Sequence, residues 1–421
     1  MRFPAVKFDF LTVLRSSNFR IFTAAQTISQ FGEKLFHIVL ISLVGAYAEG
    51  SPSVLAKVAI AFTLPAIVCA PFVGTLVDRW NRRTILIASD GLRFALIALL
   101  PFVILQRGTL SLLYPFVFGV FLLAVFFNIS KLSIIPNLVA HRGLLAANSV
   151  SLFGIRLATI CGMVLGGYIV DWSIWRKAHF EGWQAGFIIN AFLFLTSATL
   201  LARMALTSTP SGRSNGQYSF SDLRAAFRMA LQERVVRFVM LSAFLLCLIG
   251  ASIYVLVVNL VQQELAKGTT GVSWTAGILA CGTLLSALVY GHVGRRLDKA
   301  PVVSACLAVV GVLLVVLSRV TSTSSLIIVS FLGGFFLAPV PIAQDTLLHE
   351  RLDEKMRGRI FGIRDFGVNL FFAVGSLTLG LISSATSTRL AMFIMGSLIG
   401  TGSTILLLIS IRSVYATHAS A

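Results

Sequence analysis

The sequence predicts an all-α membrane protein with twelve transmembrane helices in two pseudo-symmetric halves of six. The first observation is composition: 57% of the 421 residues are hydrophobic, 12% are charged, and the mean hydropathy is +0.90. Soluble proteins are nearer half apolar and a quarter charged, so this composition excludes a soluble enzyme. The second observation is length, since twelve spans of about 20 residues require about 240 residues. The third is an internal repeat, described below.

The apolar stretches are each long enough to cross the hydrocarbon core of a bilayer. In chain order they occupy residues 19–47, 54–77, 84–106, 109–136, 144–170, 184–205, 235–262, 271–291, 300–318, 325–345, 360–383 and 389–412. The longest polar stretch, from about Leu206 to Arg234, is too short for a folded domain. We therefore expect an N-terminal six-helix half (1–205), a cytoplasmic linker (206–234) and a C-terminal six-helix half (235–421).

The linker has two parts. Residues 207–217 (TSTPSGRSNGQ) are polar and typical of a flexible connection. Residues 220–238 follow with Ser221 as a candidate N-cap and with an amphipathic pattern that is basic on one face. We expect this helix to lie along the cytoplasmic surface of the membrane.

The formal charge of +18 is best explained by membrane topology. If both termini are cytoplasmic, 22 Lys and Arg residues lie on the cytoplasmic side, seven lie on the opposite side and five lie within spans. Cytoplasmic loops of membrane proteins carry such an excess of Lys and Arg. The distribution predicts a multi-pass protein of the bacterial inner membrane with both termini in the cytoplasm, and it argues against a nucleic-acid site.

Motifs of enzymes and metal sites are absent or misplaced. The chain has no Gly-x-x-x-x-Gly-Lys-Ser/Thr loop, and His349-Glu350 lacks the second histidine of a zinc motif. Gly212–Gly216 matches Gly-x-Ser-x-Gly but lies in the polar linker. We expect no enzyme activity, no cofactor and no metal. The cysteines lie in apolar stretches and are expected to be packing residues: Cys69, Cys161, Cys247, Cys281 and Cys306.

Two pairs of similar segments indicate an internal duplication. GTLVDRWNRR (74–83) follows span 2 and aligns with GHVGRRLDKA (291–300), which follows span 8. FGIR occurs at 153–156 in span 5 and at 361–364 in span 11. The two intervals, 217 and 208 residues, agree within loop-length variation. Two homologous halves of six spans explain both.

The segment between spans 2 and 3 resembles the signature of the major facilitator superfamily. It reads Gly74-x-x-x-Asp78-Arg79-x-x-Arg82-Arg83. The resemblance implies the major facilitator fold, with inverted repeats nested in each half and alternating access to a site between the halves. It also implies that this cluster is a gate that closes the cytoplasmic side in the outward-facing state.

Other segments resemble one branch of that superfamily. Gly162-x-x-x-Gly166-Gly167 in span 5 is similar to the glycine motif of exporters, with Met163 where they carry proline. Residues 25–34, 129–149 and 333–362 resemble the branch of macrolide-type drug exporters, the enterobactin exporter and the bacterial lysophospholipid transporter. Glu33 and Lys131 stand where the lysophospholipid transporter carries an acid and a lysine.

Span 1 carries a polar stripe on one helix face, formed by Gln26, Gln30, Glu33 and His37 at i, i+4, i+7 and i+11. A charge at mid-membrane costs at least about 2.5–3.5 kcal/mol, so it must face a cavity or a partner. One interpretation is a cavity wall with Glu33 as the ion or substrate site, sensing protons if protons are used. The other is a structural pair of Glu33 with Lys34 or His37.

Three further basic residues lie within spans. Lys131 either pairs with Glu33 across the central cavity or reaches the cytoplasmic edge. Arg156 and Arg364, at equivalent repeat positions, either bind an anionic head group or brace the halves, and we favour bracing. Asp365 is expected to neutralise Arg364 locally. Asp90 and Arg93 are spaced i, i+3 in span 3, and we expect a structural ion pair.

The sequence therefore predicts a secondary transporter, expected to be a monomer in the lipid bilayer and to use ions, the membrane potential or the substrate gradient. Three hypotheses remain open. The first is efflux of amphipathic small molecules such as drugs or siderophores, with protons as a candidate coupling ion. The second is flipping of lysophospholipid across the inner membrane. The third is a membrane receptor or scaffold that produces no flux.

Overall fold

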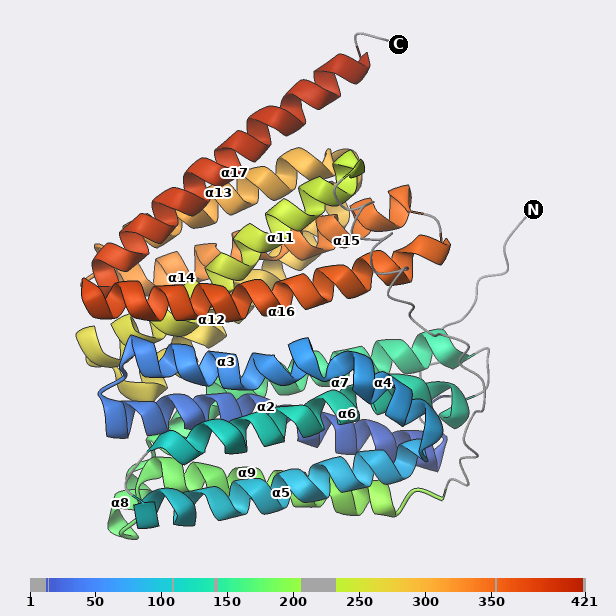
Figure 1. The fold of residues 1–421 in the computed structure, drawn as a ribbon, viewed down its shortest axis with the longest axis vertical. Coiled ribbons are helices and arrows are strands. Elements are labelled where there is room, and N and C mark those ends of the chain that lie inside the picture. The colour runs from blue at the N-terminus through green and yellow to red at the C-terminus, as the bar shows by residue number, and fades with distance from the viewer. Residues whose placement is uncertain are drawn as a thin grey trace. The chain divides into compact units, whose positions relative to one another are not determined.

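The computed structural model describes residues 13, 15–107, 110–139, 143–205, 232–352 and 354–418. All regular structure in these ranges is helical (Figure 1). Within these ranges, eleven helices are long and apolar enough to cross a membrane, and the shorter apolar helix α3 (Pro52–Val68) lies where span 2 is predicted. The prediction of an all-α membrane protein is confirmed. The linker predicted at 206–234 lies outside the described residues as far as residue 231.

The helix contacts divide the chain into two compact units. Unit 1 comprises Met1–Leu43 and Val68–Asn215, and unit 2 comprises Val44–Ile67 and Gly216–Ala421. The outer surfaces of both are apolar: Leu132 and Phe153 in unit 1 are each 71% exposed. Large exposed apolar side chains of this kind are expected on helices that contact lipid.

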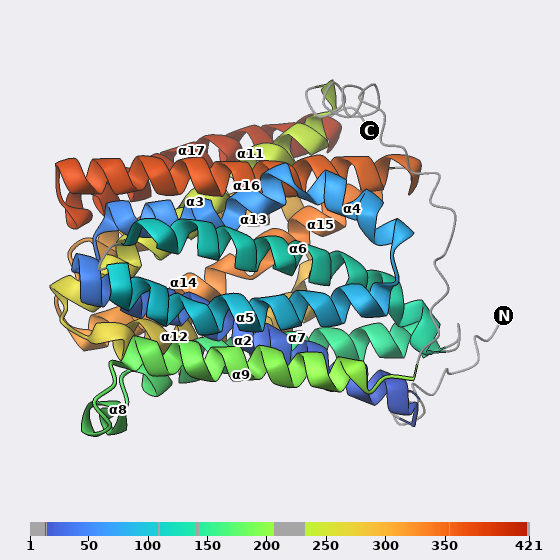
Figure 2. The same ribbon diagram turned by 60° about the horizontal axis from the view of Figure 1, so that its bottom comes forward.

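Unit 1 is a bundle of long helices in which α5 packs against α6 and α9 (Figure 2). Its core contains Phe19, Phe22, Leu86, Phe127 and Ile134, all nearly inaccessible. The elements are α2 (Ser17–Ala48, to Leu43 in this unit), α4 (Ala70–Arg79), α5 (Arg82–Arg107), η1 (Leu110–Leu112), α6 (Leu113–Leu138), α7 (Leu144–Val170), α8 (Ser173–Lys177) and α9 (Gly182–Ala202).

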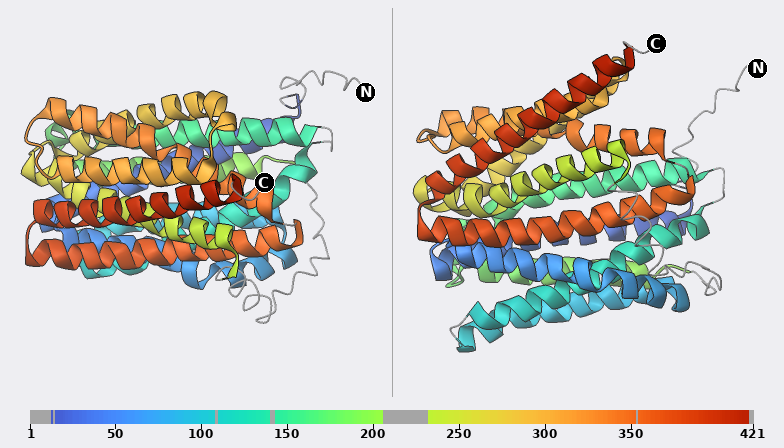
Figure 3. Two further views of the ribbon diagram at one scale, coloured as in Figure 1. Left: turned by 90° about the horizontal axis from the view of Figure 1, so that it is seen from above. Right: turned by 45° about the horizontal axis from the view of Figure 1, so that its top comes forward.

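Unit 2 is built on close pairs of helices: α13 with α17, α12 with α14, and α11 with α16 (Figure 3). Span 7 continues from α11 into two π-helical segments, η3 and η4. The elements are α3, α11 (Arg234–Ser252), η3 (Ile253–Val257), η4 (Leu260–Glu264), α12 (Gly268–Val293), η5 (Gly294–Arg296), α13 (Lys299–Leu317), α14 (Thr323–Leu337), α15 (Pro339–Arg351), α16 (Glu354–Ala385) and α17 (Thr388–His418).

Span 2 is broken between α3 and α4 at Cys69, and the boundary between the units falls beside this break. Proline in the first turn of α4 explains the break, because proline has no N–H for the preceding turn. α3 is held in unit 2 by specific contacts. Asn259 Nδ2 donates to Gly50 O at 2.8 Å, and Gly380 packs so closely on α3 that an added Cβ would lie 2.6 Å from Ala56 Cβ.

Arg389 joins three segments of unit 2 at the start of α17. Its Nε lies 2.6 Å from Glu264 Oε2, and its Nη1 donates to Ser318 O at 3.2 Å and to Val320 O at 3.0 Å. Both members of the ion pair are about one third exposed, so solvent screens them, but the two carbonyl bonds add to the interaction.

We predict that Arg389→Ala lowers the free energy of unfolding by about 1–2 kcal/mol, because hydrogen bonds from a charged group are lost. Thermal unfolding of the purified protein in detergent would measure this. Arg319→Ala, at an exposed neighbouring position, is the control and should change the melting temperature little. Equal melting temperatures for the two variants would show that Arg389 does not stabilise this end of unit 2.

Candidate functional site

The predicted polar stripe of span 1 lies on α2, and Glu33 is its charged centre. Glu33 Oε1 accepts hydrogen bonds from Lys34 Nζ and from Gln30 Nε2, both at 3.2 Å. The side chains of Glu33 and Lys34 are 16% and 21% exposed, so the pair is largely withdrawn from solvent but reachable. Lys34, the partner named in the structural interpretation, is the direct counter-ion.

The ends of the stripe differ in their surroundings. Gln26 is 1% exposed, and neither atom of its amide has a hydrogen-bond partner among the described residues. The ring of His37 packs against Phe121, with 5.0 Å between centroids. The structure thus gives the stripe one accessible charged pair at Glu33, flanked by a buried amide and an imidazole against an aromatic ring.

Glycines on neighbouring helices fix the position of α2. A Cβ on Gly162 of α7 would lie 2.9 Å from both Lys34 Cβ and Phe31 O, and one on Gly166 would lie 3.1 Å from Ile38. The span 5 glycine motif therefore packs against the helix that carries Glu33, as small residues do where membrane helices approach closely. On the α9 side, Asn190 Nδ2 donates to Gly32 O at 2.5 Å.

Asp90 and Arg93 form an ion pair on α5, with 3.2 Å between Nη1 and Oδ1. Their side chains are 0% and 1% exposed, so the pair lies in the interior of unit 1. Ser29 of α2 donates to Asp90 Oδ1 at 3.1 Å and accepts from Arg93 Nη1 at 3.4 Å. This serine joins the pair to the helix that carries Glu33.

Lys131 of α6 is 8% exposed, and its Nζ donates to Asn128 Oδ1 at 2.7 Å. No ion pair of Lys131 is found within the described part of the chain, so the pairing with Glu33, one of the two alternatives, is not made in this structure. The two groups nevertheless interact electrostatically, as do Glu33 and Arg93. Counting Lys34, the centre holds three cations and two carboxylates.

Residues of the predicted gate begin and end neighbouring helices. Gly74 and Asp78 lie in α4, and Arg79 ends it with an exposed side chain; the side chains of Gly74 and Asp78 are outside the description. Arg82 Nη1, at the start of α5, donates to Ser133 O of α6 at 2.8 Å. Arg83 Nη2 donates to Ala202 O at 2.6 Å.

The repeat-related arginines have different surroundings. Arg156 of α7 is exposed, and no ion pair to it is found within the described residues. Arg364 of α16 forms an ion pair with Asp345 of α15, lies 3.7 Å from Asp365, and stacks over the ring of Phe361. The partner of Arg364 thus lies in its own unit. The bracing role favoured for both arginines stays a prediction.

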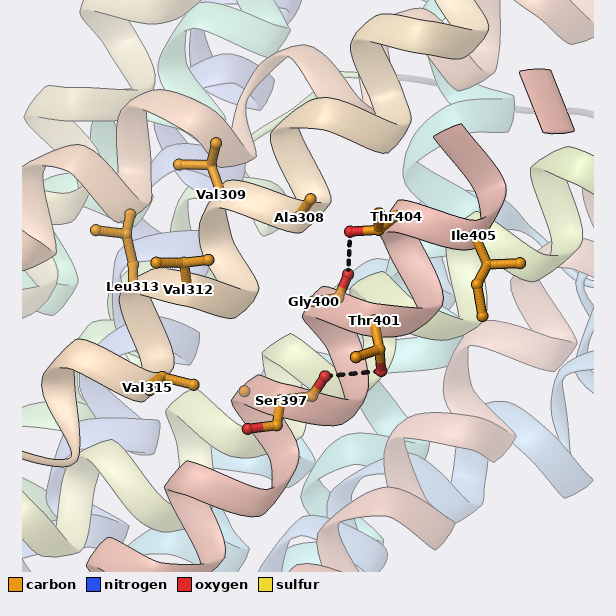
Figure 4. Close-up of a pocket in the computed structure, with 11 residues that line it drawn as sticks. Ala308, Val309, Val312, Leu313, Val315, Ser397, Gly400, Thr401, Thr404 and Ile405 are labelled. Carbon is orange, nitrogen blue, oxygen red and sulfur yellow. Dashed lines mark hydrogen bonds between the residues drawn. The ribbon is translucent and has the colours of Figure 1, made fainter. Parts of the chain in front are cut away.

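One pocket among the described residues lies elsewhere in the fold and is apolar. It is a groove of about 830 Å³ between α13 and α17, lined mainly by valine, leucine and glycine (Figure 4). The hydroxyls of Thr401 and Thr404 are bonded to carbonyls of their own helix and are not offered to a ligand. We therefore place the candidate site at the charged centre of unit 1.

Sequence reasoning did not identify three of the partners seen here. Asn128 precedes Lys131 by three residues, so the i, i+3 rule of helices was a usable signal. Ser29 lies in span 1 beside the polar stripe and has no feature in the sequence that distinguishes it from other small polar residues. Asp345 is remote in sequence from Arg364, and only the packing of α15 on α16 brings them together.

Comparison with known proteins gives a family match. A family model described as the Major Facilitator Superfamily matches residues 22–260 and 239–419. The chain is 22% identical over 321 residues to the bacilysin exporter BacE of Bacillus amyloliquefaciens, covering 76% of this chain and 78% of that protein. It is 23% identical over 371 residues to the lysophospholipid transporter LplT of Yersinia pestis, covering 84% of each.

Solved structures share the fold. A bacterial homologue of the human lysosomal transporter Spinster, in an inward-facing and unoccupied conformation, has a TM-score of 0.72 at 13% identity, covering 94% of this chain and 95% of that one. The nucleoside transporter NupG has a TM-score of 0.71 at 12% identity, covering 93% and 98%. At these identities the likeness concerns the fold.

Proposed function

This chain belongs to the major facilitator superfamily of secondary transporters, and we propose that it exports amphipathic small molecules across the bacterial inner membrane by alternating access. Both termini face the cytoplasm in this proposal, as the distribution of Lys and Arg favours. Asp78 and the arginines around it act as the cytoplasmic gate. The exporter BacE, which is similar over about three quarters of the chain, supports the outward direction.

The observation that carries the proposal is the charged centre of unit 1. Ionisable side chains within membrane helices are costly and normally serve a pathway or binding site. Glu33 and Lys34 are partly accessible, and the nearby Lys131 has only an amide partner among described residues. The excess cation suits a substrate with an anionic group, while the apolar surroundings suit its hydrophobic part.

An ion gradient is the proposed energy source. The sequence has no phosphate-binding loop for ATP. One charge that crosses a potential of 100 mV supplies about 2.3 kcal/mol, which corresponds to roughly fifty-fold accumulation. Coupling of one proton to each transported molecule would therefore suffice for efficient export.

Flipping of lysophospholipid is the second candidate function. LplT is similar over 84% of the chain, a larger share than BacE covers. A lysophospholipid is amphipathic and carries a phosphate that Lys131 could bind.

The third hypothesis is a receptor or scaffold without flux, and it predicts no transport in the dye-efflux assay or in the lipid-flipping assay described below.

We predict that Glu33→Gln reduces transport at least about tenfold. The variant removes the direct counter-ion of Lys34, so the charge of this lysine is left unpaired in the site. Efflux of ethidium and other amphipathic dyes from cells that express the protein tests export. Flipping of a fluorescent lysophosphatidylethanolamine in proteoliposomes, read by dithionite quenching, tests the lipid alternative.

Glu49→Gln, at an exposed position just after α2, is the matched control for the loss of one carboxylate. Dye efflux that Glu33→Gln reduces and Glu49→Gln preserves would support export. Lipid flipping without dye efflux would replace the proposal by the second function. Folded protein that produces neither activity would favour the scaffold hypothesis.

A further inference from the structure

The pair formed by Asp90 and Arg93 has features of a functional centre. It is completely buried within unit 1, at 0% and 1% exposure. A buried ion pair is a weak source of stability, because the cost of desolvating two charges often exceeds their attraction. Within a membrane helix an ionisable residue is by default a candidate for function. The detailed geometry of the pair indicates which function.

The carboxylate of Asp90 is only half engaged. Its Oδ1 accepts hydrogen bonds from Arg93 Nη1 and from Ser29 Oγ. Ser197 of α9 also stabilises the ionised carboxylate, while its hydroxyl donates to Ala25 O. Asp90 Oδ2 is buried and has no hydrogen-bond partner among the described residues. A proton can therefore bind Oδ2 without breaking an existing hydrogen bond. The contact with Arg93 is also a single-point contact, weaker than the two-point fork that arginine and carboxylate can form.

Arg93 has a second source of stabilisation. Its Cζ lies 5.3 Å from the ring centroid of Phe127 on α6 and 5.2 Å from that of Phe194 on α9. Cation–π contacts are stronger where water is excluded, as it is around this buried side chain. The guanidinium therefore retains favourable contacts when the charge of Asp90 is neutralised, whereas most buried cations would be left without a partner.

Charged groups reach this centre from several helices. Within α5 itself, Arg82 and Arg83 lie at the start of the helix, bonded elsewhere. α9 has no titratable residue between Gly182 and Ala202. The remaining titratable groups on these helices are Arg20, Glu33, Lys34 and His37 on the part of α2 in unit 1, Tyr114 and Lys131 on α6, Arg107 at the end of α5, and Asp78 and Arg79 at the end of α4. Of these, Glu33 and Lys131 interact electrostatically with Asp90.

We infer that Asp90 is the carboxylate that binds the coupling proton, and that Arg93 transmits the change in charge to Glu33. Arg93 already interacts with both carboxylates. When a proton from water binds Asp90, Glu33 is the one carboxylate of the centre that stays ionised among its three cations. The free energy of binding an anionic substrate group at the centre changes as a result. Ser29 lies one helical turn before Glu33 on α2 and is a positioning residue. Its hydrogen bonds to Asp90 and Arg93 fix the position of this ion pair relative to Glu33.

The assignment rests on the proposed ion coupling, and a measurement without substrate tests it separately. Infrared difference spectra of the reconstituted protein, recorded during a pH titration, detect the C=O stretch of a protonated carboxylic acid. We expect a titrating band that is lost in Asp90→Asn and kept in Glu33→Gln and Glu49→Gln. Ser29→Ala should shift the midpoint of the titration, because it removes a hydrogen bond to the ionised form.

Asp90→Asn leaves the charge of Arg93 without its counter-ion, which can prevent folding. The second variant is therefore Asp90→Asn/Arg93→Gln, which removes both charges. A band lost in the folded double variant supports the assignment equally. The assignment of Asp90 would be overturned if the band were lost in Glu33→Gln but kept in Asp90→Asn, or if no titrating carboxylic acid were detected.

A transport assay tests the same assignment once a substrate is established. The Asp90→Asn variant should still carry the substrate down its concentration gradient but should no longer accumulate it in response to a proton gradient. Unchanged accumulation would contradict the inference, while absence of flux in the native chain would contradict only the proposed function.

Discussion

Replacement of Gly334 by alanine is expected to prevent unit 2 from folding stably. A Cβ on Gly334 would lie 1.9 Å from Leu279 O and 2.8 Å from Leu279 C, so the obstacle is backbone and cannot rotate away. The opposite contact is nearly as close, because a Cβ on Gly282 would lie 2.2 Å from Phe331 O. α12 and α14 would have to separate along their crossing, at a cost of about 3 kcal/mol, the upper end of the usual range for overpacking.

The neighbouring glycine provides a matched control for this prediction. No heavy atom lies within 4 Å of a Cβ built on Gly333, although it is in the same helix. Gly333→Ala should therefore be neutral or stabilise the protein by up to about 1 kcal/mol, since alanine favours the helix. Size-exclusion profiles and melting temperatures in detergent compare the two variants. Similar melting temperatures would show that α12 and α14 can move apart at little cost.

The elements of the fold were predictable because a membrane leaves few options. Apolar runs of the required length can only be helices there, since every backbone group must be bonded internally. Span 5, predicted at 144–170, is α7 with the same limits, Leu144–Val170. The break at Cys69 in span 2 was not predicted: it depends on proline in the first turn of α4, which hydropathy does not register.

The candidate site was predictable in its residues but only partly in its contacts. Helical periodicity is sufficient to pair Asp90 with Arg93, because both lie on one helix. Contacts between helices depend on rotations that the sequence does not specify. Ser29 meets the ion pair only because α2 turns that face toward α5, and Lys131 bonds Asn128, a partner that neither of the two alternatives for this lysine named.

Replacement of Gly162 by alanine is expected to lower transport about tenfold while the protein remains folded. The added Cβ would lie 2.9 Å from Lys34 Cβ and from Phe31 O, closer than real contacts of this kind. α2 must then shift by a few tenths of an ångström, and it would carry the Glu33–Lys34 pair with it. Displacements of about 1 Å in a positioned site cost about a hundredfold in rate, so a smaller shift should cost less.

Gly91→Ala is the control, since no heavy atom lies within 4 Å of a Cβ at Gly91, which adjoins Asp90 in the same unit. Dye efflux and lipid flipping should be close to native in Gly91→Ala and reduced in Gly162→Ala, with melting temperatures within a few degrees. A Gly162→Ala protein with native transport would mean that the position of α2 against α7 does not govern the charged centre. Reduced transport with intact stability would make the span 5 glycines part of the transport machinery, because their role would then be to place Glu33.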